Sequence, residues 1–80
     1  MKLPRDTSGS ALAQALCKHW GYRRVHQSGS HIILETEDPS HHRIAVPAHE
    51  ALRVGTLGGI LRAVATHKGI TRDEILLKTL

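Results

Sequence analysis

The spacing of apolar residues changes twice along this chain, and these changes limit the folds open to it. Over residues 11–20 apolar side chains recur with a helical period, over 22–46 they alternate in short runs, and from 57 onward the helical period returns. With 80 residues, the chain makes a single domain (1–80) with a thin core. We therefore predict an α+β fold of order α-β-β-β-α, with a short helix added at the end.

Capping residues predict the limits of the first helix. The polar cluster Thr7-Ser8-Gly9-Ser10 precedes the apolar run and Gly21 follows it. Such residues favour helix starts and ends, which gives a helix from about residue 9 to 19. Residues 1–6 are expected to be a loose lead-in. Cys17 falls at an apolar position of this helix and is interpreted as a core residue.

A second helix and a short third one follow the strands. Thr56 is predicted to cap the second helix, and Gly69 to end it. The pair Gly58-Gly59 in its first turn predicts a close approach to another backbone or to a ligand. Thr71-Arg72-Asp73-Glu74 has the form of a capping box and predicts a last helix that ends near Leu80.

Three short segments are predicted as strands of an antiparallel meander. They cover residues 22–26, 30–37 and 42–46, with turns at 27–29 and 38–40. The two longer helices are expected to cover one face of this three-stranded sheet, which leaves the other face open. The strand residues assigned to the core are Val25, Ile32, Leu34, Ile44 and Val46.

The motif Gly29-Ser30-His31 is the sharpest local feature. If Ile32 faces the core, strand alternation places His31, Ile33 and Glu35 on the open face. A histidine there can accept a proton near neutral pH. Two interpretations stay open on these residues alone: a plain surface histidine, or a general base.

The distribution of charge bears on that choice. The formal net charge is +4, which favours a polyanionic partner. Hairpin closure is expected to bring Arg24 and His26 alongside His31, and to carry the acidic segment 35–38 to the far end of the sheet. A basic end at His31 would suit a phosphodiester.

Metal ions, cofactors and membranes are not expected. A metal site could be sought at four of the histidines (His31, His41, His42 and His49), but no HExxH or CxxC spacing is present, and His41 and His42 should point to opposite faces. No apolar run is long enough to span a bilayer. A single cysteine fits a reducing cytoplasm.

Three motifs in series resemble the HicA toxin family. They are Gly29-Ser30-His31, Val46-Pro47-Ala48-His49, and Gly55-Thr56-Leu57 leading into Ile60-Leu61, and the likeness runs from about residue 7 to 74. Order and spacing both match.

The resemblance implies a fold similar to the double-stranded-RNA-binding domain. It also implies a ribosome-independent messenger-RNA endonuclease that a HicB-type antitoxin holds inactive, and it makes His31 the catalytic residue. The chain departs from the family pattern at His26, Ser28, Ile32 and Gly58, where the family often has a basic residue or a second histidine.

On this interpretation His31 removes the 2′-hydroxyl proton and the RNA cleaves itself without a metal ion. The leaving-group acid would be His26, His49 or water, and an acidic antitoxin segment would cover the open face that carries His31, Ile33, Arg43 and Ala45.

Three other functions remain open: a non-catalytic RNA-binding module, a degenerate toxin that retains antitoxin binding, and a protein-interaction domain. The residues expected to contact RNA are Arg23, Arg24, His26, Ser30, Arg43 and His49.

Overall fold

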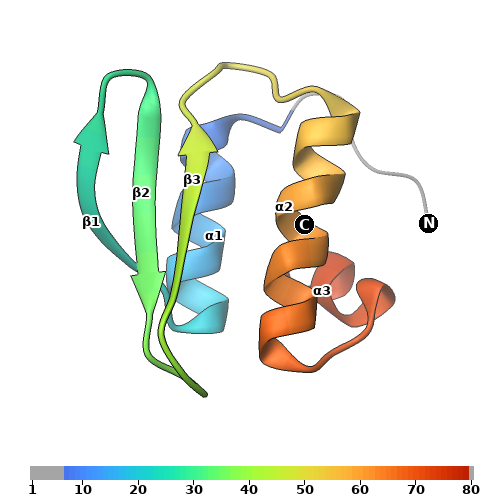
Figure 1. Ribbon diagram of the computed structural model, residues 1–80. Helices are drawn as coiled ribbons and strands as arrows, with labels where there is room; N and C mark the ends of the chain where they lie inside the picture. Colours follow the sequence, from blue (N-terminus) through green and yellow to red (C-terminus); the bar gives the residue numbers. More distant parts are fainter. Residues whose placement is uncertain (1–6, 80) are drawn as a thin grey trace.

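Three helices and three strands follow one another in the predicted order in the computed structural model, which describes residues 7–79. The predicted lead-in (1–6) lies outside the described residues. Within the described part, no helix is long and apolar enough to cross a membrane. The elements are α1 (Gly9–Trp20), β1 (Arg23–Ser28), β2 (His31–Thr36), β3 (His42–Pro47), α2 (Val54–Lys68) and α3 (Arg72–Thr79) (Figure 1).

The strands form an antiparallel sheet of order β1-β2-β3. One face of this sheet packs against α1 and α2, and α3 packs against both of these helices (Figure 1). The opposite face, called the open face below, carries no helix within residues 7–79. This arrangement confirms the predicted α+β architecture. Fully buried core side chains come from all layers and include Leu12, Leu16, Ile32, Leu34, Val46, Leu57, Leu61, Val64 and Ile75.

A β-bulge interrupts β1. The pairing register with β2 shifts between Arg24 and His26, so the intervening Val25 has no partner of its own. The side chain of Val25 is 45% exposed. Its predicted place in the core is therefore wrong, because the extra residue breaks the strict alternation on which that prediction depended.

The limits of α1 and the start of α3 confirm the capping predictions. The hydroxyl of Ser8 accepts a hydrogen bond from the Ala11 N–H (3.0 Å), and Gly21 ends α1 with a φ of 72°. At α3, the Thr71 hydroxyl accepts from the Glu74 N–H (3.2 Å).

The start of α2 differs from the prediction. The helix begins at Val54, and the carbonyl of Arg53 accepts the Leu57 N–H at 2.9 Å, so Thr56 lies inside the first turn and is not its cap. A Cβ added at Gly59 would meet no atom within 4 Å. The predicted close approach of another backbone is therefore wrong at Gly59, whereas the approach of a ligand stays a prediction.

The close backbone approach occurs instead at Gly9, the first residue of α1. Its N–H donates to the His49 carbonyl (2.9 Å), and a Cβ at this position would overlap the carbonyl oxygen of Pro47. Nearby, the Leu52 N–H donates to the Thr7 carbonyl (2.8 Å). Only glycine lets the start of α1 lie this close to the end of β3.

We expect the Gly9→Ala variant to be destabilised by about 1–3 kcal/mol or more, because the added methyl group meets a backbone carbonyl that cannot rotate away. Urea unfolding monitored by circular dichroism measures the change. Gly59→Ala is the matched control: it adds the same methyl group in open space within a helix and should raise stability by roughly 0.5–1 kcal/mol. Wild-type stability in Gly9→Ala would contradict the steric argument.

Candidate active site

His31 is the first residue of β2 and follows a two-residue turn, Gly29-Ser30. Gly29 has a φ of 59°, and no non-glycine residue in the described chain has a positive φ. A glycine at the first central position fits a type II′ hairpin turn, which matches the twist of the two strands. The turn therefore delivers the exposed His31 side chain at one end of the sheet.

The pairing register places three rows of side chains on the open face, because paired residues in adjacent strands point to the same face. His26 lies diagonally from His31, and diagonal neighbours are about 7–8 Å apart. Both imidazoles are exposed. They can therefore flank one small ligand group. The rows are Ser28–His31–Pro47, His26–Ile33–Ala45 and Arg23–Glu35–Arg43.

Ile33 lies on the open face as predicted, yet its side chain is only 9% exposed. It stands on the central strand, with His26 on one side and Ala45 on the other. Neighbouring rows thus shield it from solvent. The open face offers a partner less apolar surface than the sequence suggested.

The His31 ring makes no hydrogen bond within residues 7–79. Three other histidines are engaged through their rings, namely His41, His42 and His67. An imidazole without a protein partner can turn to meet a proton donor on a bound ligand. His31 thus has the freedom that a general base needs.

Backbone hydrogen bonds bring the β3–α2 loop to the His31 end of the sheet. The Ala48 N–H donates to the Ser30 carbonyl at 2.6 Å, next to His31. The His49 carbonyl is held in turn by Gly9, at the start of α1. The loop that carries His49 therefore lies at the same end of the sheet as Ser30 and His31, and the His49 side chain is exposed.

Arg24 does not lie alongside His31, so that spatial prediction is wrong. It pairs with the buried Leu34 and lines a hollow beside Gln14 and Cys17 of α1. The cause is the bulge, since one extra residue turns Arg24 and His26 to opposite faces. Burial raises the pKa of the Cys17 thiol, an effect that Arg24 opposes in part.

Arg23 and Arg43 lie at the other end of the open face, on either side of Glu35. Their guanidinium nitrogens are each 3.7 Å from a Glu35 carboxylate oxygen, and Arg23 is also 3.4 Å from Glu37. Glu35 is four residues beyond His31, roughly 13 Å along the strand. The structure therefore does not bring these two arginines to His31, and the acidic end is largely neutralised.

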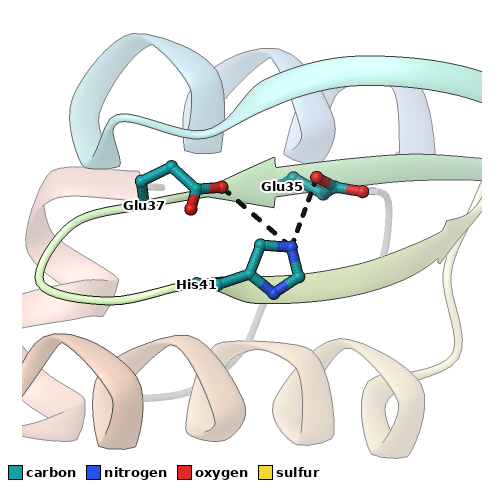
Figure 2. A group of neighbouring side chains, drawn as sticks. All are labelled: Glu35, Glu37 and His41. Atoms are coloured by element: carbon teal, nitrogen blue, oxygen red, sulfur yellow. Dashed lines mark hydrogen bonds and ion pairs between the residues drawn. The ribbon is translucent and has the colours of Figure 1, made fainter.

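Glu35, Glu37 and His41 form a cluster that the sequence analysis did not single out (Figure 2). Their ligand atoms lie within 4.8 Å of one another, a spacing that could hold a metal ion. Two guanidiniums already contact the 16%-exposed Glu35 and would compete with a cation. We interpret the cluster as an ion-pair network across the β2–β3 hairpin.

A second polar group, also missed, joins the end of α2 to the same hairpin. The Tyr22 hydroxyl and His42 Nδ1 are 2.8 Å apart, and the His42 and His67 rings stack with centroids 4.3 Å apart. The Lys68 ammonium donates to the Thr36 hydroxyl (3.1 Å) and to a hairpin carbonyl. These residues lie up to 46 positions apart, so no local pattern reveals the group.

Burial sets the ionisation of this junction. It raises the pKa of Tyr22 to about 12. It also lowers the pKa of His42, with further lowering from the nearby charges of His67, His41 and Lys68. The neutral form of His42 is therefore favoured by folding.

The family model described as HicA toxin of bacterial toxin-antitoxin matches residues 9–65, well over half of the chain. The chain belongs to the HicA toxin family. No curated protein and no solved structure matches it. The matched region of this HicA toxin contains α1, the whole sheet and most of α2, and therefore His31. Membership implies a toxin of a toxin–antitoxin system, with a cognate antitoxin as its partner.

We expect stability to fall as the pH drops through the ordinary histidine pKa of 6.5. The unfolded state takes up a proton on His42 there, whereas the folded state resists it, so acid favours unfolding. Urea unfolding between about pH 8 and pH 5 measures the slope, which should be flatter in His42→Asn. His19→Asn, at an exposed site on α1, is the control and should keep the wild-type slope. Equal slopes in all three proteins would refute this assignment.

Proposed function

We propose that this HicA toxin is an endoribonuclease that cleaves messenger RNA with His31 as the general base. The observation that carries the proposal is the exposed His31 imidazole, free of hydrogen bonds within the described chain, at the end of the sheet where the β3–α2 loop arrives. Family membership supports a toxin, and the site supports this chemistry.

RNA carries its own nucleophile, the 2′-hydroxyl, so the reaction needs a base, an acid and alignment. His31 takes the 2′-hydroxyl proton while that oxygen attacks the adjacent phosphorus. The bond from phosphorus to the 5′-oxygen breaks, which leaves a cyclic phosphate on one fragment. The departing oxygen takes a proton from an acid and becomes the 5′-hydroxyl of the other. No step requires a metal-bound water.

Two histidines are candidates for the acid. His26 is the diagonal neighbour of His31 on the open face, and His49 follows the end of β3 on the other side of it. Either can lie across a phosphodiester from His31, with water as the third option. His26 has the better support, because a strand position is more rigid than a loop position.

The remaining proposed RNA contacts divide by position. Ser30 and His49 lie at the His31 end and would contact the cleaved nucleotides. Arg23 and Arg43 lie at the far end of the open face, where they would meet neighbouring phosphates in competition with Glu35. Arg24 would contact only an RNA strand that passes along the β1 edge of the sheet.

A second candidate function is a degenerate toxin that retains antitoxin binding without cleavage. The orientation of Arg24 toward α1 favours it, since the strand register places none of the arginines of β1 and β3 beside His31 to stabilise charge on the phosphate. The same experiment separates the two functions.

We expect His31→Ala to lower the rate of RNA cleavage by ~10²–10⁴, the usual contribution of a general base. Stability should change by no more than about 0.5 kcal/mol, because the side chain is exposed. The assay follows a single-stranded RNA in the presence of a metal chelator. His19→Ala is the matched control and should cleave at the wild-type rate. Full activity in His31→Ala would exclude the assignment, and an inactive wild-type protein would select the degenerate toxin.

We further propose that the antitoxin inhibits by covering the open face. This face is free of helices, and it holds His31 within the area that a docked segment would shield. Because Ile33 is largely shielded and Arg43 already contacts Glu35, exposed Ala45 in the middle row becomes the point to probe.

We expect Ala45→Arg to weaken binding of a HicB-type antitoxin encoded beside the toxin gene. The long side chain would stand in the middle of the covered surface and prevent close contact there. Because the arginine adds a positive charge, weaker binding would not come from repulsion of acidic groups. Biolayer interferometry with purified proteins measures the affinity. Ala51→Arg, an equally exposed alanine in the β3–α2 loop, is the control. Unchanged affinity in Ala45→Arg would place the antitoxin elsewhere.

A further inference from the structure

A hollow between α2 and α3 lies apart from the His31 site. Its volume is about 290 Å³. The hollow belongs to the helical layer: among the strands α2 contacts only β3, and α3 contacts none within the described chain. It is lined by Gly58, Arg62, Ala65, Thr66, Ile70 and Arg72.

Two guanidinium groups of this hollow, those of Arg62 and Arg72, have no carboxylate partner within residues 7–79. Every ion pair within residues 7–79 includes Glu35 or Glu37, at the β2–β3 hairpin. Asp73 and Glu74 adjoin Arg72 in the first turn of α3, yet neither pairs with Arg62 or Arg72. This contrasts with Arg23 and Arg43, which Glu35 already neutralises.

The rest of the lining suits a small anion. Thr66 lies one helical turn after Arg62, so its hydroxyl stands on the same side of α2. Gly58, one turn earlier, carries no side chain and leaves that end of the hollow open. Ala65 and Ile70 supply the apolar part of the lining. Two guanidiniums and a hydroxyl are donors that match the several acceptor oxygens of a phosphate.

We propose that this hollow binds a phosphate of the RNA backbone at a distance from the cleaved bond. This proposal rests on the proposed function, because it takes RNA as the substrate. The phosphate bound here is not the one attacked, because His31 lies on the open face and the hollow lies in the helical layer. A long RNA would thus contact two sides of a molecule 18 Å thick along its shortest axis.

The test measures RNA affinity in the His31→Ala background, so that no cleavage occurs. The probe is a single-stranded RNA of about 20 nucleotides, long enough to reach both sites. Adding Arg62→Gln and Arg72→Gln should weaken binding and reduce the slope of log K against log salt by ~0.7, the value for one phosphate contact on a single strand. Circular dichroism confirms that each variant is folded.

The control for the effect of net charge is the double variant Lys18→Gln with Lys78→Gln. It removes the same charge from α1 and α3, outside the hollow. This pair should leave the slope closer to its original value than the arginine pair does. An equal fall in both pairs would overturn the proposal, because it would reflect net charge and no specific contact.

A second arm adds inorganic phosphate and follows the Nε–H signals of Arg62 and Arg72 by NMR. Shifts of these signals, together with the loss of slope, support an RNA phosphate site. Shifts with an unchanged RNA slope would assign the hollow to free phosphate and overturn the proposal. An unchanged RNA slope with weaker antitoxin binding would overturn it in favour of an acidic protein segment. If the slope falls but the wild-type protein cleaves no RNA, this inference stands and the proposed cleavage fails.

Discussion

The close contact between the start of α1 and the end of β3 is the constraint on which the site depends. Gly9 has no side chain, so its backbone can lie against Pro47 and bond to the next loop. The same loop bonds through Ala48 to Ser30, which precedes His31. A glycine in a helix therefore sets the position of a histidine 22 residues away in the sequence, through backbone groups alone.

The opposite end of the sheet is held by a different kind of interaction. There the side chains of Tyr22, His42 and Lys68 connect the hairpin to the end of α2. A domain this small buries a modest core, so these polar contacts carry a larger share of its stability than they would in a bigger protein. Backbone bonds at the His31 end do not titrate, whereas the side-chain contacts of His42 at the other end do. Acid therefore weakens the fold through the contacts of His42.

The sequence predicts what local chemistry controls. Ser8 and Gly21 mark the limits of α1, and the alternation around Ile32 correctly puts His31 on the open face. The sequence does not predict features that depend on an extra residue in a strand or on a partner far away in the chain. The bulge at Val25 reverses the expected side of Arg24, and the pairing of Arg43 with Glu35 appears only once the register of two strands is known. The roles of these residues toward RNA remain proposals, because patterns of apolar and capping residues predict the fold and not the contacts with a ligand.

The bulge has a further consequence for a protein that must be made in a cell before its antitoxin binds. β1 is an edge strand, and all six of its residues are exposed. A regular exposed edge is a template on which a second chain can add a strand and begin to aggregate. The unpaired Val25 interrupts the row of free backbone groups, and the charged side chains of Arg23 and Arg24 adjoin the break. The irregularity that turns Arg24 away from His31 thus also makes β1 a poorer template for a strand of a second copy of the toxin.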